Sequence, residues 1–288
     1  MPKRSVRVLP ILIVVIAFIA GCVNQNTYMH DVDVLSKQYL WALADNLAKD
    51  IDTKFARATD TIDSMANAIT LSTTGKTDRD EELIYQYLEN MAKANSDILA
   101  FYIIWDEPKY AQGVFQDYGQ ITRMTMSDAV FASDWYTNPL STGKHYITPE
   151  PREADYDGEQ YIFMTLSRPF VVNGKTAGVV SVDIALDYIV RPVWHARVYD
   201  TGYAMLLSPT QVYLTHPNRN LIGQKYELTQ KEVAHFNNKE IFTKVETSKA
   251  TGITRDVFFT PIVLTRTATF FYVAVNVPRH ERLVNVKN

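Results

Sequence analysis

The chain has 288 residues, and its 29 lysines and arginines against 32 aspartates and glutamates give a formal net charge of −3. Its 47% hydrophobic and 21% charged residues are typical of a folded protein and exclude a disordered or collagen-like chain. The length fits one or two domains, and there is no basic excess of the kind that nucleic acid binding requires. The single cysteine, Cys22, excludes an intramolecular disulfide, a zinc finger and an iron–sulfur cluster.

Residues 1–21 are predicted to be a secretory signal peptide. Lys3, Arg4 and Arg7 precede an uncharged, mostly apolar run over residues 8–23. This run is shorter than the ~20 apolar residues that a membrane-spanning helix needs.

The end of this run, Ile19-Ala20-Gly21-Cys22, resembles the lipobox of bacterial lipoproteins. The resemblance implies cleavage before Cys22 and lipid attachment to it. Each buried acyl methylene contributes about 0.8 kcal/mol, so several acyl chains would hold the protein firmly on a membrane. We therefore predict a lipoprotein of the cell envelope that faces the periplasm or the exterior. The alternative is an uncleaved N-terminal anchor that happens to contain a cysteine.

A long helix is predicted after the anchor, within residues 22–75. Apolar residues recur every three or four positions from Asp31 onward, and no glycine or proline interrupts them before Gly75. Roughly forty residues at 1.5 Å each give a rod of about 60 Å. Such a helix is either the spine of an elongated two-lobed domain or part of a coiled coil. The predicted apolar stripe consists of Leu35, Tyr39, Leu43, Leu47, Ile51, Phe55, Ala58, Ile62, Met65 and Ile69.

Strand signals dominate the chain after a shorter helix over residues 77–91. Branched and aromatic residues fill 98–105, 161–172 and 176–184. Asn173-Gly174 lies between the last two runs, and this dipeptide in such a setting indicates a β-hairpin.

A second, smaller set of strands follows a helical connector over residues 187–197. Strands are predicted at 201–207, 212–216, 241–246, 255–259 and 269–277, with helical material at 229–236. We therefore expect an α+β fold in which a long spine helix is followed by two antiparallel-sheet lobes, over residues 76–198 and 199–288.

Five segments resemble, in order and spacing, the double Cache family of extracytoplasmic sensor domains with two stacked PAS-like modules. They are Ser133–Tyr136, Gly143–Pro149, Asn173–Asp187, Asp200–Leu207 and Leu214–Gly223. The resemblance implies a small-molecule sensor and not an enzyme. It also implies that the ligand binds in the first, membrane-distal lobe and that the second lobe is membrane-proximal.

Trp135, Tyr136, Tyr146 and Asp183 match positions that the family uses to bind ligands. Aromatic faces attract cations within about 6 Å of the ring, and a carboxylate completes an ammonium site with a charge-assisted hydrogen bond. Other roles stay open for the same residues. Trp135 and Tyr136 would also suit the packed cap of the lobe, Asp183 would suit the N-cap of the following helix, and Tyr146 would suit the core.

The amino-acid signature of the family is incomplete in this chain. In members that bind amino acids, an arginine two positions before the tryptophan takes the ligand carboxylate, and an acidic residue lies near the proline. Here these positions hold Ser133 and Thr148. An amine without a carboxylate is therefore favoured, while Arg168 or Arg123 would restore a zwitterionic or anionic ligand by supplying the missing cation.

The predicted hairpin adds two residues to the candidate site. With a two-residue turn at Asn173-Gly174, Asp183 lies opposite Met164 and Ser181 opposite Leu166. Because side chains alternate across a sheet, Asp183, Ser181 and Arg168 then share one face. The opposite face is expected to be apolar and to meet the spine helix; it carries Val180, Val182, Ile184, Phe163 and Thr165.

Asp155–Gly158 resembles part of a calcium loop, but the remaining ligands of that motif are missing and a β-turn is favoured. We expect no metal site and no cofactor. An enzyme is not indicated, because the sequence contains no Gly-x-Ser-x-Gly motif and no phosphate loop.

We expect a membrane-tethered sensor module that binds an amine or an amino-acid-like molecule. After the second lobe the sequence contains no kinase or cyclase region and no second spanning segment. We therefore expect it to signal through a partner membrane protein. The alternatives are a lipoprotein that delivers its ligand to a transporter and a structural or interaction lipoprotein with a vestigial pocket.

Overall fold

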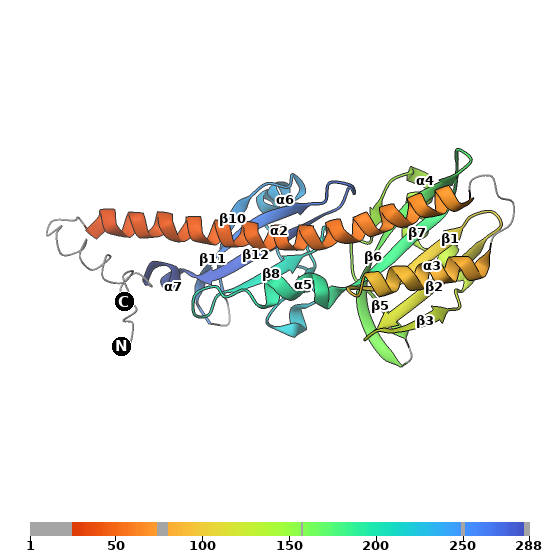
Figure 1. Ribbon diagram of the computed structural model, residues 1–288. Helices are drawn as coiled ribbons and strands as arrows, with labels where there is room; N and C mark the ends of the chain where they lie inside the picture. Colours follow the sequence, from red (N-terminus) through yellow and green to blue (C-terminus); the bar gives the residue numbers. More distant parts are fainter. Residues whose placement is uncertain (1–24, 74–79, 157, 249–250, 285–288) are drawn as a thin grey trace, which may run out of the picture.

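The structure is a computed structural model that describes residues 25–73, 80–156, 158–248 and 251–284. The predicted signal peptide and the predicted lipid attachment site Cys22 lie outside these residues. One long helix runs beside two β-sheets that follow each other along its length (Figure 1). Within the described part of the chain, no helix has the length and apolar character needed to cross a membrane.

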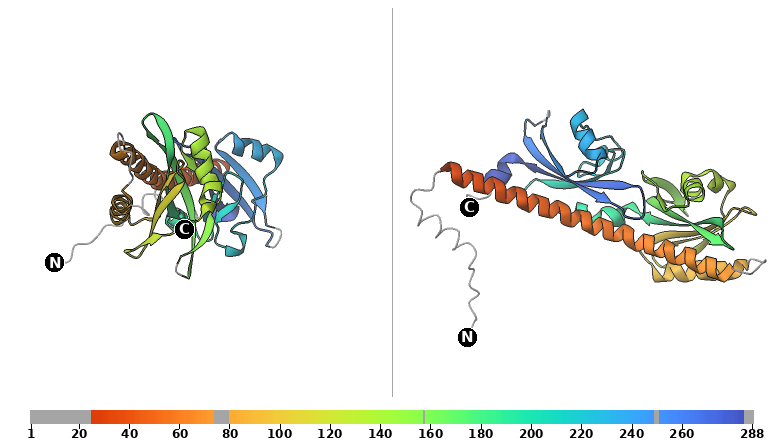
Figure 2. Two further views of the ribbon diagram at one scale, coloured as in Figure 1. Left: turned by 90° about the vertical axis from the view of Figure 1, so that its right-hand side faces the viewer. Right: turned by 90° about the horizontal axis from the view of Figure 1, so that it is seen from above.

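Helix α2, Gln25–Thr73, forms the predicted spine. Its 49 residues correspond to about 74 Å at 1.5 Å per residue, and it lies along both sheets (Figure 2). Most of the predicted stripe is its buried face, which includes Leu47, Ile51, Phe55, Ala58, Ile62, Met65 and Ile69.

The stripe prediction is wrong at the N-terminal end of α2. Leu35 and Tyr39 are 65% and 50% exposed, whereas Ser36 is buried. At this end the helix packs against the short helix α7, Arg279–Val284, rather than against a sheet alone. Arg282 Nη1 of α7 donates to Ser36 Oγ over 3.1 Å, so a neighbouring face of α2 is the buried one.

The first lobe contains helix α3 and a seven-stranded antiparallel sheet in the order β3-β2-β1-β7-β6-β4, with β5 paired to β6. Helix α3 begins at Glu81, later than predicted, because the Asp80 carboxylate accepts the Leu83 N–H over 3.0 Å and caps it. The elements are α3 (Glu81–Ala94), β1 (Ile98–Trp105), β2 (Tyr110–Asp117), β3 (Gln120–Met124), η1 (Asp128–Ala132), α4 (Asp134–Thr142), β4 (Tyr146–Ile147), β5 (Arg152–Tyr156), β6 (Glu159–Val172) and β7 (Lys175–Ala185).

The second lobe contains a five-stranded antiparallel sheet in the order β10-β11-β12-β8-β9. Helix α5 connects the lobes, and α6 begins with a capping box between Thr229 and Glu232. The elements are α5 (Leu186–Trp194), β8 (Tyr203–Leu207), β9 (Tyr213–Thr215), η2 (Arg219–Leu221), α6 (Gln230–Asn237), β10 (Phe242–Thr247), β11 (Thr254–Val263), β12 (Phe270–Pro278) and α7.

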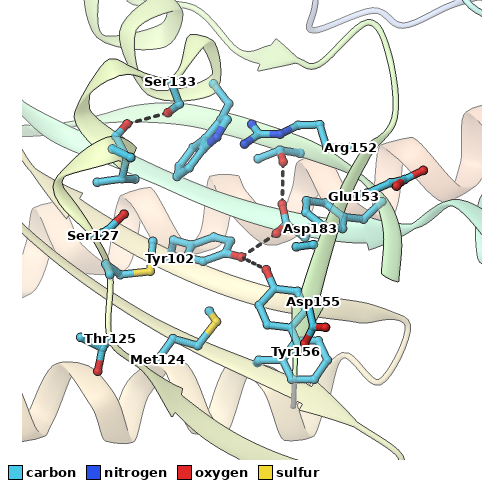
Figure 3. Close-up of a pocket in the computed structure, with 18 of the residues that line it drawn as sticks. Tyr102, Met124, Thr125, Ser127, Ser133, Arg152, Glu153, Asp155, Tyr156 and Asp183 are labelled. Carbon is cyan, nitrogen blue, oxygen red and sulfur yellow. Dashed lines mark hydrogen bonds between the residues drawn. The ribbon is translucent and has the colours of Figure 1, made fainter. Parts of the chain in front are cut away.

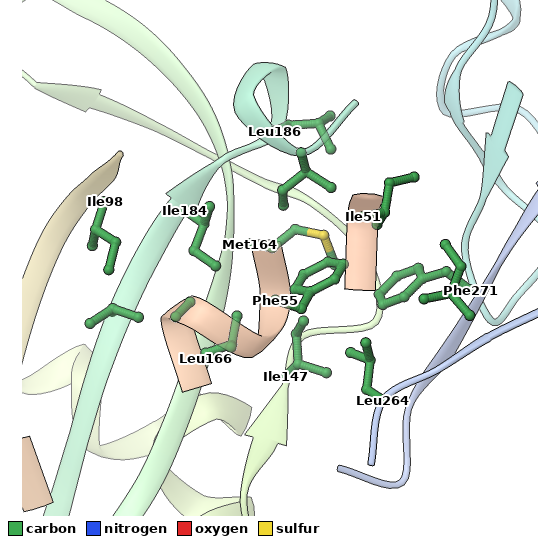
Figure 4. Packing of buried hydrophobic residues seen from close by; sticks show 14 of the residues in the cluster. Ile51, Phe55, Ile98, Ile147, Met164, Leu166, Ile184, Leu186, Leu264 and Phe271 are labelled. Atoms are coloured by element: carbon green, nitrogen blue, oxygen red, sulfur yellow. The ribbon is translucent and has the colours of Figure 1, made fainter. Parts of the chain in front are cut away.

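Helix α2 contributes to the core of both lobes. Ile51 and Phe55 of α2 lie between Met164 of the first sheet and Phe271 of the second (Figure 4). The rings of Phe55 and Phe271 are stacked, with centroids 5.2 Å apart and planes inclined by 7°. One continuous hydrophobic core therefore joins the two sheets through the helix.

The turn between β6 and β7 has the conformation that its sequence predicts. Asn173 and Gly174 have φ angles of 51° and 79°, and Val172 pairs with Lys175. Two positive φ angles are the requirement of the tight hairpin turn for which Asn-Gly is suited.

A β-bulge then changes the register of this hairpin. Val171 pairs with Thr176, but Phe170 pairs with Gly178, so Ala177 is an extra residue on β7. Such an insertion shifts every later pair by one position and reverses the predicted faces of one strand relative to the other.

The predicted pairs beyond this bulge are therefore wrong. Asp183 lies opposite Thr165 instead of Met164. Thr165 and Phe163 share the face of Asp183, whereas Arg168 lies on the opposite face, toward α2. The prediction that Arg168 joins the face of Asp183 is corrected by this one extra residue.

Candidate functional site

A cavity of about 560 Å³ lies on the face of the first sheet that is turned away from α2 (Figure 3). This volume falls within the roughly 300–1,000 Å³ that is usual for small-molecule sites. Strands β1, β2, β3, β5, β6 and β7 and the start of α4 contribute to its walls. Its lining includes Tyr102, Phe115, Met124, Ser133, Trp135, Arg152, Tyr156, Thr165 and Asp183.

Asp183 is the buried acidic group of this cavity, with 3% of its surface exposed. Its carboxylate accepts hydrogen bonds from Thr165 Oγ1 over 2.6 Å and from the Tyr102 hydroxyl over 2.5 Å. Burial raises the pKa of Asp183 to about 6, although these two hydrogen bonds and the charge of Arg152 act in the opposite direction. Asp183 is therefore available as an anion near neutral pH.

A network of hydroxyl groups holds the Asp183 carboxylate in place. The Tyr102 hydroxyl lies 3.1 Å from that of Tyr156 and donates to Asp183 (Figure 3). Burial, together with the nearby Asp183 charge, raises the pKa of Tyr102 well above its usual value, which keeps its proton in place. The alternative role of Asp183 as a helix cap is excluded, since Ala185 is the N-cap of α5 and no side chain caps this helix.

Arg152, at the start of β5, places a cation at the same cavity. Its guanidinium carbon lies 5.6 Å from the centroid of the Trp135 ring, and Nη1 lies 3.8 Å from Asp134 Oδ1. The guanidinium donates no hydrogen bond within the described parts of the chain, and 38% of the side chain is exposed. Beside this long ion pair with Asp134, its N–H groups are available to an anion in the cavity.

The two arginines considered from the sequence are already occupied. Arg168 Nη1 donates to Asp63 of α2 over 2.6 Å. Arg123 lines the cavity, but its guanidinium forms ion pairs with Glu82 and Glu89 of α3, both at 2.7 Å. Neither guanidinium is as available to a ligand as that of Arg152.

The predicted aromatic residues divide between the cavity and other contacts. Trp135 lines the cavity and packs against Tyr102, with ring centroids 5.7 Å apart. Tyr136 lies outside the lining, where its hydroxyl donates to Asp106 over 2.6 Å. Successive residues of a helix point about 100° apart, so Trp135 and Tyr136 of α4 face different ways.

Tyr146 and Ser181 also lie outside the cavity lining. The Tyr146 hydroxyl donates to Asp134 Oδ2 over 2.7 Å. Ser181 is on the face of Asp183 but is fully buried, and its hydroxyl donates to Ser167 over 3.0 Å. Of the six predicted binding residues, the structure thus places only Asp183 and Trp135 at the cavity.

Most lining residues were not singled out from the sequence as binding residues, among them Tyr102, Arg152, Tyr156 and Thr165. Tyr102 lies on β1, which pairs with β7 so that Tyr102 is opposite Ser181. Side-chain alternation along β1 places Tyr102 on one face of the sheet. Only the pairing of β1 with β7 shows that this is the face of Asp183. Asp155, near the end of β5, also lines the cavity, and its carboxylate accepts the Gly158 N–H over 2.8 Å.

Two antiparallel sheets thus follow each other along one helix, and a ligand-sized cavity lies on the outer face of the first sheet. A sequence model of the Cache domain family, dCache_1, matches residues 32–286. The chain belongs to the Cache domain family. Cache domains are extracellular or periplasmic sensory domains rather than enzymes.

The fold is shared with sensor domains of bacterial chemoreceptors. The periplasmic sensory domain of Campylobacter jejuni Tlp1 is 14% identical, with a TM-score of 0.73 over 87% of this chain and 98% of that chain. The ligand-binding domain of Pseudomonas fluorescens CtaA in complex with L-isoleucine is 20% identical, with a TM-score of 0.64 over 91% and 98%. That of Pseudomonas aeruginosa PctB in complex with L-Arg is 20% identical, with a TM-score of 0.61 over 85% and 95%.

Proposed function

We propose that the protein is a lipid-anchored extracytoplasmic sensor module that signals through a partner membrane protein. Its first lobe, residues 76–198, binds a small amine or amino-acid-like molecule, and its second lobe, residues 199–288, lies nearer the membrane. Membership of the Cache family and the cavity of about 560 Å³ support the sensor role. The lipobox-like sequence that ends at Cys22 supports the anchor.

The main support for the ligand assignment is that one cavity contains both an acidic and a basic side chain. Asp183 provides a buried carboxylate for an ammonium group, and Arg152 provides, for a carboxylate, a guanidinium that donates no hydrogen bond to the described residues and forms only a 3.8 Å ion pair with Asp134. Arg152 thus supplies the cation that Ser133 lacks. Between an amine and an amino-acid-like zwitterion, this arrangement favours the zwitterion.

The rest of the lining favours an apolar ligand side chain. Phe115, Met124 and Val130 present apolar surface, and methionine adapts to ligands of different shape. Glu153 and Asp155 are exposed acids that also line the cavity (Figure 3), so a second carboxylate on the ligand would meet like charges. The complexes of CtaA with L-isoleucine and of PctB with L-Arg support a ligand of the amino-acid type.

A thermal-shift screen on residues 24–288 tests this proposal. The panel pairs each standard amino acid with the amine that lacks its carboxylate and the acid that lacks its amine. A ligand at a hundred times its dissociation constant adds about 2.7 kcal/mol to the unfolding free energy, and only compounds that carry both groups are expected to do so.

Three variants assign the contacts in this screen. Asp183→Asn and Arg152→Gln should each abolish the shift, while Arg123→Gln, at the same cavity but held by α3, should keep it. If the amines shift the wild type and Arg152→Gln equally, the ligand has no carboxylate contact with Arg152. If no compound in the panel binds, the structural lipoprotein with a vestigial pocket becomes the better interpretation.

The anchor is tested separately in cells. Cys22→Ser should release the protein from the membrane fraction and remove the acyl mass from its N-terminal peptide, while Asn26→Ser should change neither. A Cys22→Ser protein that stays in the membrane with its first residues intact would favour the uncleaved anchor. A ligand-delivery role would be favoured if the protein bound a transporter only when the ligand is present.

A further inference from the structure

The segment that joins β4 to β5, together with Arg152 at the start of β5, touches both the cavity and the second lobe; we call residues 148–152 the strap. Arg152 at its C-terminal end lines the cavity. Two residues earlier, the Glu150 carboxylate accepts a hydrogen bond from Ser208 Oγ over 2.9 Å and another from Thr210 Oγ1. Ser208 and Thr210 belong to the β8–β9 turn of the second lobe.

Glu150 supports a turn that depends on the Ser208 hydroxyl. Ser208 is fully buried, and its Oγ accepts the N–H of Val212 over 3.0 Å and that of Thr210 over 3.3 Å while it donates to Glu150. Hydrogen bonds to a carboxylate are roughly twice as strong as those between neutral groups. The orientation of the Ser208 hydroxyl, and hence the turn, is therefore set in part by a residue of the first lobe.

The N-terminal end of the strap is tied to the floor of the cavity. Thr148 is buried; its N–H donates to the Thr165 carbonyl over 3.0 Å and its Oγ1 accepts the Thr165 N–H over 3.1 Å. Thr165 in turn donates to Asp183. Both ends of the strap are thus attached to residues that line the cavity.

The strap itself is short and stiff. Pro149 and Pro151 flank Glu150, and proline fixes φ near −65°. The two prolines therefore leave the backbone between Thr148 and Arg152 with few free φ angles. By contrast, Arg123 at the same cavity is anchored to α3 and has no such link to the second lobe.

We propose that the strap couples the cavity to the β8–β9 turn of the second lobe, so that an anionic group bound by Arg152 changes how Glu150 holds Ser208 and Thr210. This inference rests on the proposed function for its biological meaning, because the ligand is what moves Arg152. The coupling between the strap and the turn does not require a ligand and can be tested without one. Linkage makes it reciprocal, so a change in the second lobe also changes the cavity.

Hydrogen exchange of the amides of residues 210–212, measured on residues 24–288 without any ligand, tests the coupling. Glu150→Ala should speed their exchange at least threefold, because the Ser208 hydroxyl loses its acceptor. Arg152→Gln should also change their exchange at least twofold, although Arg152 forms no hydrogen bond or ion pair with the described residues of the second lobe. Arg123→Gln is the matched control and should leave these amides at the wild-type rate.

Equal exchange in Arg152→Gln and wild type would overturn the proposal, as would equal exchange in Glu150→Ala and wild type. A second measurement runs in the opposite direction and avoids changes in the cavity. Ser208→Ala should shift the indole N–H resonance of Trp135, which lies under Arg152, and an unmoved resonance also counts against the coupling. Since no ligand is used, failure here is distinct from failure of the ligand screen.

Discussion

Thr165 lies directly across the β6–β7 hairpin from Asp183, and its Oγ1 donates a 2.6 Å hydrogen bond to Asp183 Oδ1. The Tyr102 hydroxyl occupies the other carboxylate oxygen over 2.5 Å. Both donors are neutral, so they orient the carboxylate without cancelling its charge. A buried anion held in this way attracts a cationic group that enters the cavity.

Asp183→Asn is expected to change how stability depends on pH. Burial raises the pKa of Asp183 from 3.8 to about 6 in the folded protein, so the folded state binds this proton more tightly than the unfolded state. Asp183 therefore lowers stability progressively as pH rises from about 4 to about 6. The full effect is on the order of 3 kcal/mol at neutral pH.

Chemical denaturation from pH 4 to pH 7 checks this prediction. The difference in unfolding free energy, Asp183→Asn minus wild type, should become more positive as pH rises over this range, since the wild type alone loses stability through this group. Asp63→Asn serves as a comparison, because the pKa of Asp63 is lowered in the fold by its contacts with His145 and Arg168, although its burial acts in the opposite direction. Its stabilising charge is lost as pH falls through its folded pKa, so its difference should change little above pH 5.

Gly178→Ala is expected to be strongly destabilising. Gly178 follows the bulge residue of β7, and a Cβ there would lie 2.0 Å from the Ile104 carbonyl oxygen and 2.7 Å from the Phe170 ring. Both neighbours are fixed within the sheet core, so we expect a loss of about 3 kcal/mol or more. Gly119→Ala, at an open position with φ of +84°, should cost only about 1–2 kcal/mol; equal losses would contradict the close packing at Gly178.

The spine helix and most strands could be predicted because their patterns are local. Each of these elements is recognisable from its own residues alone. Examples are the three- and four-residue spacing of α2, the branched residues of β1 and the Asn173-Gly174 turn. The bulge at Ala177 could not be predicted in this way. It lies beside Gly178, whose close approach to β1 involves a strand some seventy residues earlier in the chain.

The candidate site was predictable only in part for the same reason. Asp183 and Trp135 were identified from the family resemblance, and both line the cavity. Arg152 was missed because β5 is a short, polar edge strand whose composition resembles that of a loop. Arg168 was assigned to the wrong face because a single inserted residue reverses the alternation.

Phe55→Ala should destabilise both lobes together. Phe55 is 1% exposed and stacks on Phe271 of the second sheet, while its helix also packs against β6 of the first. Removal of a buried phenylalanine typically costs about 3–5 kcal/mol of unfolding free energy.

Leu71→Ala, at a position of α2 that is 78% exposed, is the control and should cost less than about 0.5 kcal/mol. Calorimetry of Phe55→Ala should show one transition at a lower temperature, and a normal transition for one lobe beside an early one for the other would argue against a shared core.

Asp256→Ala should separate α7 from the rest of the second lobe. Asp256, 5% exposed, accepts hydrogen bonds from Arg279 over 2.5 Å and from Arg282 over 2.9 Å, and Arg282 also contacts Asp33 of α2. Because the buried Arg282 guanidinium would keep Asp33 as its remaining anionic partner, we expect a loss of about 3 kcal/mol, the lower end for a broken buried ion pair. Asp256→Asn keeps the shape and one acceptor and should cost less.

The exposed pair of Asp45 and Lys49 on α2 provides the control for Asp256, since its members are 53% and 70% exposed. Asp45→Ala should change stability by no more than about 0.5 kcal/mol. Urea unfolding measures all three variants, and exchange of the α7 amides shows where the loss occurs. If Asp256→Ala behaves like Asp45→Ala, the contacts with Arg279 and Arg282 do not hold α7 against the sheet, and its other contacts with β11, β12 and α2 would have to fix its position instead.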